Sequence, residues 1–328
     1  MSIWTNNVFD MKKLNWNSPT DLPSIPTDRC VLHTPPAWTT QWVLDGPSCP
    51  LERFGCGFER HDLVRYSAKG YSQYGADGVI GKLFHDLGTT DKYYVEFGTQ
   101  KDATECNTRR LRETCAWSGL LMDGGNANAT INLHTAFITR ENIGVLFKRH
   151  KVPKHFDLLS VDIDGNDYHV LSAILRAGYR PRVVVVEYNA QLGPEKDLVA
   201  KYSPTHRWDM SCYISASITA FYKLARLNGY SIVASMLPDL YWVRDDVLVG
   251  KSGKPKVSYA HTNNVTALFY AAARDVGNEL MFKPPSKEDI TNCLNVFGLR
   301  GWDTYYSAEF GVEVMRQSVR ASAKAMSW

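Results

Sequence analysis

Hydrophobic and polar positions follow two different periods along the middle of the chain. Several short runs are apolar at almost every position, and the clearest contains four consecutive valines within 182–188. Such runs suit parallel strands that are buried on both faces. Between them, apolar residues recur every three to four positions, as on one face of a helix. The pattern predicts strands at 93–97, 119–123, 136–139, 156–162 and 182–188, and helices at 75–87, 107–115, 143–149, 168–177 and 217–228.

Two further apolar runs, 231–236 and 240–244, are separated by Pro238 and Asp239, which predicts a hairpin. Strands that alternate with helices form a doubly wound α/β sheet, and the hairpin would add an antiparallel edge. We therefore predict one α/β domain over 65–249.

The two ends of the chain differ from the middle. Residues 1–64 are rich in proline and tryptophan, which excludes long helices and predicts an irregular arm or, alternatively, an aromatic platform for a substrate. A helical extension is expected over 250–328. Its expected helices are 265–273, 286–297 and 304–325, with Ser286 and Asp289 as a capping box. A lid, a homodimer contact and simple packing are all compatible with this extension.

Composition narrows the classes of function. The chain has 328 residues, of which 44% are hydrophobic and 22% charged, as is typical of a globular enzyme. A net charge of +3 without a long basic run gives no support for a nucleic-acid partner. No apolar run is long enough to predict a membrane span, and the first residues lack the pattern of a secretory signal. We therefore expect a cytoplasmic protein.

The seven cysteines are scattered, and none forms a Cys-x-x-Cys pair, which argues against a zinc site. Cys49 and Cys56 flank a loop rich in proline and glycine and could pair in an oxidising compartment. Free thiols in a reducing cytosol are the interpretation that we favour.

Carboxylates stand near the ends of four predicted strands, namely Glu96, Asp123, Asp162 and Glu187. In an open parallel sheet, ligands bind beyond the carboxyl ends of the strands. The turn after the first strand lacks G-x-G-x-x-G, and no G-x-x-x-x-G-K-[ST] loop occurs, which disfavours a pyrophosphate cofactor. Glu96 and Asp123 instead favour a cofactor with a cationic group and a ribose. S-adenosylmethionine has both.

Several segments, in this order, resemble the FkbM-type class I S-adenosylmethionine-dependent methyltransferases. They are YSQYGADG (71–78), VEFGT (95–99), WSGLLMDG (117–124), TRENI (139–143), LSVDIDGNDY (159–168) and VEYN (186–189). The resemblance covers about residues 70–250. It implies a seven-stranded Rossmann-like sheet of order 3-2-1-4-5-7-6 with an antiparallel seventh strand, which agrees with the predicted hairpin.

The resemblance also implies which residues bind the cofactor. The implied contacts are Gln73, Glu96, Gly98 and Gln100 with the methionine part, Asp123 with Gly124 at the ribose, Glu141 and Asn142 at the adenine, and Asp162 near the transferred methyl group. The family's glycine-rich turn is replaced here by 100–104, so the resemblance does not define the backbone contacts of this turn. Asn107 and Arg109 open the following helix and are candidates to bind the cofactor's carboxylate.

Methyl transfer from a sulfonium to a hydroxyl needs an in-line acceptor and the loss of a proton. Asp162 and Asp164, and His169 one turn into the next helix, are the candidate bases. Asp162, Glu187 and Asn189 form an all-oxygen set that suits Mg²⁺ or another divalent cation, similar to catechol-type metal-dependent O-methyltransferases. The alternative is that these groups bind the cofactor, cap the helix or bind one another without a metal.

The segment after Glu187 carries His206, Trp208 and Asp209, where this fold builds acceptor pockets, although an ordinary surface loop is as good an interpretation. The leading hypothesis is O-methylation of a small-molecule acceptor, a sugar or another small polar metabolite. A non-catalytic scaffold of the same fold and a nucleotide-dependent enzyme such as a dehydrogenase are the alternatives.

Overall fold

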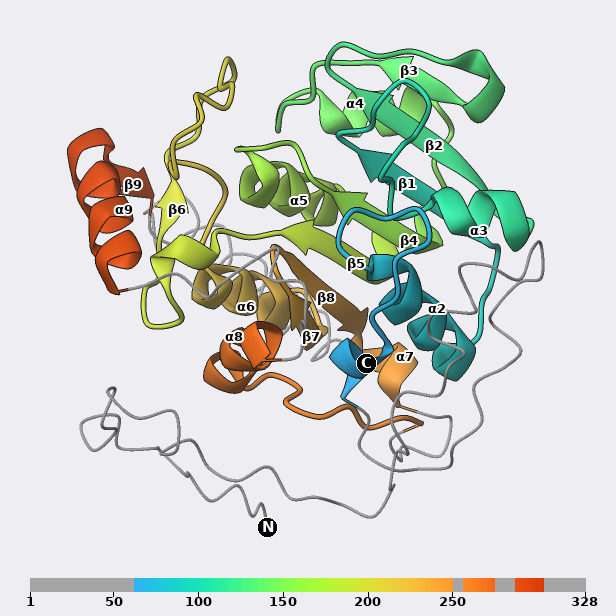
Figure 1. The fold of residues 1–328 in the computed structure, drawn as a ribbon. Coiled ribbons are helices and arrows are strands. Elements are labelled where there is room, and N and C mark those ends of the chain that lie inside the picture. The colour runs from blue at the N-terminus through green and yellow to red at the C-terminus, as the bar shows by residue number, and fades with distance from the viewer. Residues whose placement is uncertain (1–61, 250–255, 275–286, 304–328) are drawn as a thin grey trace, which may run out of the picture. The chain divides into compact units, whose positions relative to one another are not determined.

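A seven-stranded sheet forms the centre of the computed structural model, which describes residues 62–249, 256–274 and 287–303. Its strands are β1 (Tyr93–Phe97), β2 (Ser118–Asp123), β3 (Leu133–Thr135), β4 (His155–Val161), β5 (Arg180–Glu187), β7 (Tyr230–Met236) and β8 (Asp239–Arg244). The order in space is β3-β2-β1-β4-β5-β8-β7 (Figure 1). Strands β1 to β5 pair in parallel, and β8 runs antiparallel to both β5 and β7. The predicted doubly wound sheet with an antiparallel last strand is confirmed.

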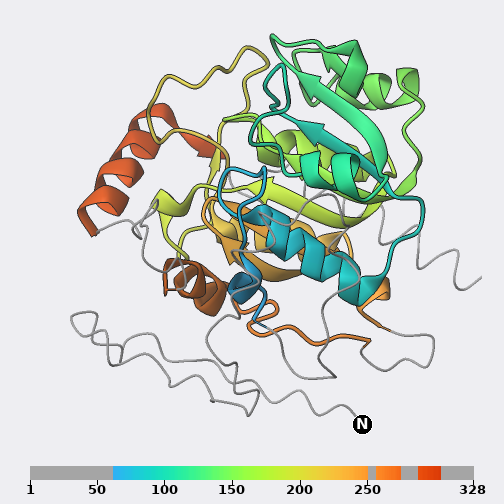
Figure 2. The same ribbon diagram turned by 45° about the vertical axis from the view of Figure 1, so that its right-hand side comes forward.

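Helices cover both faces of this sheet. They are α2 (Ala76–Leu87), α3 (Arg109–Thr114), α4 (Ile143–Arg149), α5 (Asp167–Arg176), α6 (Ile218–Leu227), α7 (Asp245–Leu248) and α8 (Val265–Arg274). Helix α9 (Lys287–Arg300) packs in a separate cluster with Leu192 and Ala200. The short 3₁₀ turns are η3 (Leu63–Tyr66), η4 (Ala129–Ile131) and η5 (Ala190–Leu192). One hydrophobic cluster joins the sheet to α4, α5, α6 and α8, and a second joins it to α2 and α3. The turned view shows α2 lying across the central strands (Figure 2).

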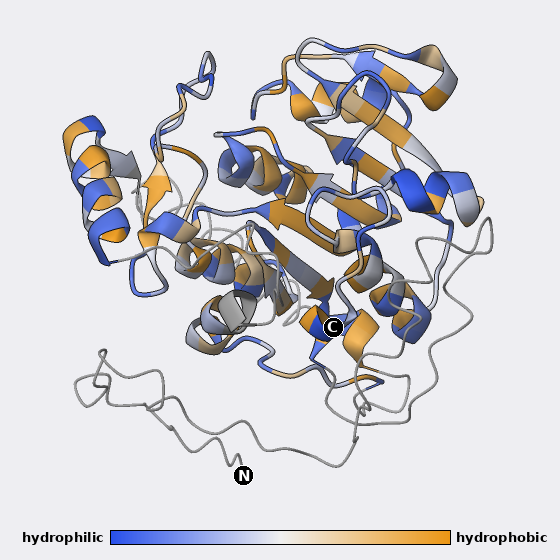
Figure 3. Cartoon of the chain, in the orientation of Figure 1, coloured by the Kyte–Doolittle hydropathy of each residue, from blue (hydrophilic) through white to orange (hydrophobic). Residues whose placement is uncertain are grey.

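Strand β5 explains why the sheet is buried on both sides. Val183, Val184, Val185 and Val186 are each at most 1% exposed. Val184 and Val186 belong to one cluster, whereas Val183 and Val185 belong to the other. Burying one such side chain contributes about 1.5–3 kcal/mol, so this strand stabilises both layers. Hydropathy colouring shows the same run as a hydrophobic band through the middle of the sheet (Figure 3).

The third strand is Leu133–Thr135 and not 136–139, so the predicted position is wrong. Leu133 pairs with Leu121 of β2 and is 2% exposed. Phe137, by contrast, is 37% exposed, and Phe137 and Ile138 line a cavity. The apolar run at 136–138 therefore forms part of a cavity wall, which a hydrophobicity pattern cannot distinguish from a strand.

The predicted helix at 265–273 is present as α8, and Leu268 and Phe269 join the main core. Asn264 begins it, since its Oδ1 accepts a hydrogen bond from Ala267 N at 3.0 Å. The predicted arm up to residue 61, Ser286 with its capping box, and the predicted helix from 304 lie outside the described residues. No helix among the described residues has the length and hydrophobicity needed to cross a bilayer.

Three of the four described cysteines form disulfides, so the expectation of free thiols is wrong for them. Cys212 pairs with Cys293, Cys115 is also disulfide-bonded, and only Cys106 is free and buried. Cys212 and Cys293 are 81 residues apart. They meet because β6 (Val199–Ala200) pairs with β9 (Trp302–Asp303), which follows α9. The sequence suggested a disulfide only between cysteines close together in the chain, so this bond was not expected. Cys49 and Cys56, the pair considered there, lie outside the described residues.

Candidate functional site

Two adjoining cavities open at the carboxyl ends of the parallel strands, the edge that the sequence predicted. The larger, of about 680 Å³, is lined by residues that end β1, β4 and β5 and by the β7–β8 turn. The smaller, of about 130 Å³, lies towards β2 and the segment after β3. Gly98 and Asp164 line both cavities, so the two form one continuous site.

Gly98 lets the ends of β1 and β4 meet. Its φ is +72°, and a Cβ at this position would overlap the carbonyl oxygen of Asp162. Only glycine accepts both the left-handed backbone and the close approach. The floor between the two cavities therefore depends on this residue.

Glu96 fixes the loop that closes one side of the larger cavity. Its Oε1 accepts a hydrogen bond from Asn107 N at 2.7 Å, and Oε2 accepts from Thr108 N at 3.1 Å and from Thr108 Oγ1 at 2.5 Å. Burial raises the pKa of Glu96, and these donors oppose the shift. Asn107 Nδ2 donates in turn to Ser160 Oγ at 3.1 Å, which ties the loop to β4.

The predicted methionine contacts Gln73, Glu96, Gly98, Gln100 and Asn107 all line the larger cavity. Arg109 is not among the lining residues. It pairs with Glu113 at 2.8 Å and its guanidinium lies over the ring of Tyr71.

The smaller cavity holds the ribose candidate. Asp123 and Gly124 line it, and Asp123 Oδ1 accepts from Gly125 N and Asn126 N at 2.7 Å each. Its apolar wall comes from Phe137 and Ile138. Neither residue was expected in the site, because the hydrophobicity pattern predicts a strand at 136–139.

The predicted adenine contacts Glu141 and Asn142 do not line the cavity. Asn142 Oδ1 accepts from Thr139 N at 2.8 Å and Nδ2 donates to Phe137 O at 2.8 Å, so Asn142 shapes the loop that carries the apolar wall. Glu141 pairs with Arg140 and accepts a hydrogen bond from the hydroxyl of Tyr202.

Three carboxylates converge at the ends of β4 and β5. Oxygens of Asp162, Asp167 and Glu187 all lie within 4.8 Å of one another. Asp167 is held by backbone donors, Ile163 N at 2.8 Å and Gly165 N at 2.9 Å. Oε2 of Glu187 is buried and has no hydrogen-bond partner among the described residues. Such an arrangement requires a cation or a shared proton.

The pKa values of these three acids are raised, as expected for carboxylates that lie close together without a cation between them. Burial, followed by repulsion from the neighbouring acids, raises the pKa of both Asp162 and Glu187 well above the usual range. Burial raises the pKa of Asp167 to about 6, although its backbone donors oppose the shift.

Asn189 differs from its predicted role. Its Nδ2 donates to Cys212 O at 2.6 Å and to Ile214 O at 3.2 Å, and its Oδ1 accepts from Gln191 N at 3.0 Å. It lines the cavity and holds a loop, and Asp167 is the third carboxylate close to Asp162 and Glu187. The sequence presented Asp167 as an ordinary first-turn acid of α5.

The candidate bases are placed differently from one another. Asp164 lines both cavities, and burial raises its pKa while His206 opposes the shift. His169 lies outside both linings, with Nε2 2.8 Å from Ala200 O. His206 lines the smaller cavity, and its ring packs against Gly165.

Asp239 is a site residue that the sequence analysis used only as a turn. It stands opposite Glu187 in the β5–β8 ladder, lines the larger cavity, and has its pKa raised by burial to about 7. Tyr74 faces this group: burial, followed by repulsion from Asp162, Glu187 and Asp239, raises its pKa to about 12. The predicted hairpin was the available signal, because its turn returns the chain to the same edge of the sheet.

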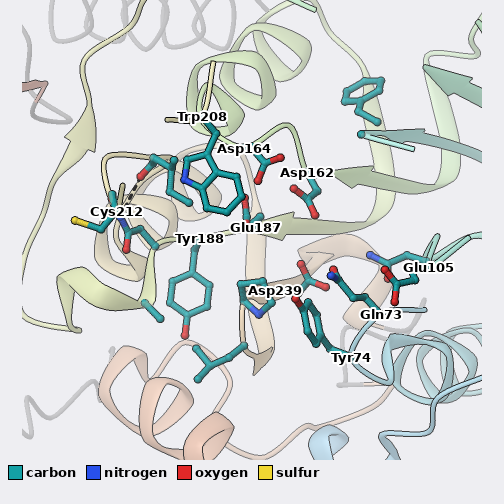
Figure 4. Close-up of a pocket in the computed structure, with 18 of the residues that line it drawn as sticks. Gln73, Tyr74, Glu105, Asp162, Asp164, Glu187, Tyr188, Trp208, Cys212 and Asp239 are labelled. Atoms are coloured by element: carbon teal, nitrogen blue, oxygen red, sulfur yellow. Dashed lines mark hydrogen bonds between the residues drawn. The ribbon is translucent and has the colours of Figure 1, made fainter. Parts of the chain in front are cut away.

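The far wall of the larger cavity comes from the loop after β6. Trp208, Met210, Ser211 and Cys212 line it, and Trp208 Nε1 donates to Ser211 O at 2.8 Å. In the close-up, the acids Asp162, Asp164, Glu187 and Asp239 lie between Trp208 on one side and Gln73 and Tyr74 on the other (Figure 4).

The larger cavity is strongly acidic. Its described lining contains no lysine, arginine or histidine. The carboxylates that line it are Glu96, Glu105, Asp162, Asp164, Glu187, Asp239 and Asp289.

The strand order and the single antiparallel strand are those of the class I methyltransferase fold, which is Rossmann-like. No family profile matches the chain. No curated protein sequence matches it either. Membership of the FkbM-type family therefore stays a prediction.

Three solved structures with distant similarity are of the MycE methyltransferase from the mycinamycin biosynthetic pathway. The complex with Mg and SAH is 14% identical, over 58% of this chain and 57% of that one, with a TM-score of 0.37. The complex with Mg, SAH and mycinamycin VI is 12% identical, over 69% and 59%, with a TM-score of 0.35. A second crystal form with Mg and SAH is 11% identical, over 73% and 61%, with a TM-score of 0.36. The chain thus matches less than two thirds of the length of MycE, and at this distance the similarity assigns no residue a role.

Proposed function

We propose that the chain is an S-adenosylmethionine-dependent O-methyltransferase that acts on a hydroxyl of a sugar or another small polar metabolite, with a divalent cation such as Mg²⁺ at the site. The observation that carries this proposal is the close group of Asp162, Asp167 and Glu187 beside a cavity that is lined by Asp123. A site with cation-binding oxygens and an adjoining nucleoside pocket is what metal-assisted methyl transfer needs.

The cofactor fits across the two cavities. Asp123 would accept hydrogen bonds from the ribose hydroxyls, and Phe137 and Ile138 offer the adenine an apolar wall. Beyond Gly98, the larger cavity would take the methionine part and its sulfonium. The carboxylates that line this cavity favour a positive charge there.

The residues present fit a hard divalent cation. Such ions prefer carboxylate oxygens, and Asp162, Asp167 and Glu187 supply three that are already close together. A cation bound here would be a partner for the buried Oε2 of Glu187, which has no hydrogen-bond partner among the described residues. A bound cation would lower the pKa of a coordinated acceptor hydroxyl.

Asp164 is the residue that we assign as the base. It lines both cavities and so lies where the cofactor's sulfur and the acceptor would meet. A raised pKa suits a group that must take up a proton near neutral pH. Asp239 is the second candidate, and single Asp→Asn variants at the two positions distinguish them: the base variant loses turnover while its affinity for SAH is unchanged.

Titration calorimetry with SAH tests the cofactor assignment. Asp123→Ala should weaken SAH binding about tenfold or more, because each buried hydrogen bond to a charged group contributes about 1.5–3 kcal/mol. Glu141→Ala is the matched control, since Glu141 is exposed and outside the cavity. Binding of NAD in place of SAH would refute the assignment in favour of a dehydrogenase.

A further inference from the structure

We propose that the end of the larger cavity walled by residues 208–212 and by Asp289 of α9 is the acceptor subsite, and that it admits uncharged or cationic acceptors and rejects anionic ones. This inference rests on the proposed function. It adds the charge class of the acceptor and a role for the C-terminal extension.

The charge of the cavity sets the first condition. Seven carboxylates line it, and its described lining has no cationic side chain. One of these acids, Glu105, pairs with Lys69 at 4.0 Å, and the cofactor's sulfonium and a divalent cation would balance part of the remaining negative charge. An acceptor with a phosphate, sulfate or carboxylate group would meet an unbalanced negative field in a partly desolvated space. A neutral polyol pays no such penalty, and an amine is attracted.

Trp208 is the second feature that selects the class of acceptor. Its side chain is 45% exposed at the cavity, and Met210 beside it is 79% exposed. The hydrogen bond from Trp208 Nε1 to Ser211 O fixes the ring. An exposed indole face binds the apolar face of a ring and attracts a cation, so it favours the same two acceptor classes. The close-up shows Trp208 beside Asp164, the proposed base (Figure 4).

The wall is held in place from α9. The disulfide Cys212–Cys293 joins them, and Asp209 pairs with Arg300 at 2.8 Å. Tyr213 Oη donates to Gly301 O at 2.5 Å. Asp289 precedes Cys293 by one helical turn and therefore lies on the same face of α9, which is how it reaches the cavity. Cys293 and Arg300 act as positioning residues for the acceptor wall.

Saturation-transfer NMR on the SAH-saturated chain tests the charge class directly. The probes are phenyl β-glucoside, its 2-amino-2-deoxy counterpart and phenyl β-glucuronide. The glucoside and the amino sugar should bind, and the glucuronide should bind about tenfold more weakly or not at all. Glucuronide binding equal to that of the glucoside would overturn the inference.

Asp289→Asn refines the test. This variant should bind the amino sugar several-fold more weakly and bind the glucoside with unchanged affinity. Glu288→Gln is the control, because Glu288 is exposed on the same helix but does not line the cavity. If both variants weaken the amino sugar equally, Asp289 is not part of the subsite.

The Cys293→Ser variant tests whether the disulfide to α9 holds the acceptor wall in place. This variant should lose affinity for the glucoside about tenfold and keep its affinity for SAH, since no described residue of α9 lines the smaller cavity. Reductant should reproduce the effect in the unmodified chain and add little in the variant. An equal loss of SAH and glucoside binding would refute a role limited to the acceptor wall. Failure of the unmodified chain to bind SAH would instead refute the proposed function.

Discussion

The carbonyl oxygen of Asp162 lies so close to the α-carbon of Gly98 that a single methyl group there would overlap it. Gly98→Ala must therefore move the end of β4, and with it Asp162. We expect a loss of at least about 2 kcal/mol of unfolding free energy, from backbone strain together with the overlap. We also expect SAH affinity to fall.

Gly88→Ala is a matched control for this variant. Gly88 also has a positive φ, +67°, but a Cβ there meets nothing within 4 Å. It should cost about 1–3 kcal/mol in a denaturant titration, from backbone strain alone, and leave SAH affinity unchanged. Equal effects of the two variants would show that the contact with Asp162 has no consequence.

Glu187→Gln removes one charge from three that repel each other. Because burial, followed by repulsion from the neighbouring acids, raises the pKa of Glu187, we expect the metal-free variant to have a higher Tm than the unmodified chain. We also expect Mg²⁺ to raise the Tm of the unmodified chain and not that of the variant. Differential scanning calorimetry with and without EDTA measures both effects, and a Mg²⁺ response retained by the variant would contradict the assigned ligands.

The stability of the metal-free chain should fall as pH rises between about 4 and 7. Asp239 has a folded-state pKa of about 7, above the ordinary 3.8. In this window the folded chain holds a proton that the unfolded chain has lost, so unfolding becomes easier as pH rises. The shift corresponds to at most about 4 kcal/mol. Asp239→Asn should flatten the pH profile of Tm, and an unchanged slope would show that Asp239 does not titrate in this range.

Arg182→Met should destabilise the fold without affecting the site. Arg182 donates to Asp157 Oδ1 at 2.6 Å, and Asp157 is 0% exposed. Removing one partner of a buried ion pair costs about 3–5 kcal/mol, because the other charge stays buried. Asp157 stands near the start of β4, at the opposite end of that strand from Asp162. Denaturant titration should show the loss, and SAH affinity in native buffer should be unchanged.

The fold could be predicted because its signals are local. The valine run of β5 and the acids at the strand ends depend on neighbours in the sequence, and the structure places both as expected. The site residues that were not predicted are brought together by contacts between residues far apart in the sequence. Asp167 joins Glu187 only once β4 and β5 pair, and Asp239 reaches the same edge only through the β7–β8 turn. Phe137 looked like a strand residue because an apolar cavity wall and a buried strand have the same composition.

The expectation of free thiols in a reducing cytosol does not hold for three of the four described cysteines. Cys115, Cys212 and Cys293 are all disulfide-bonded. Such bonds persist chiefly in oxidising compartments. Alkylation of the chain in its native cells followed by mass spectrometry should find Cys293 unlabelled. Labelled Cys293 would place the chain in a reducing environment.

Because of the four valines of β5, substitutions near the acids at the end of this strand have different consequences from substitutions in the wall formed by residues 208–212. Glu187 directly follows Val186, so the acids proposed to bind a metal stand at the end of a strand on which both hydrophobic layers depend. The proposed acceptor wall is instead joined to α9 by a disulfide, outside those two layers. Substitutions in the wall therefore leave the chemistry in place, and a chain built this way can acquire a new acceptor without rebuilding its core.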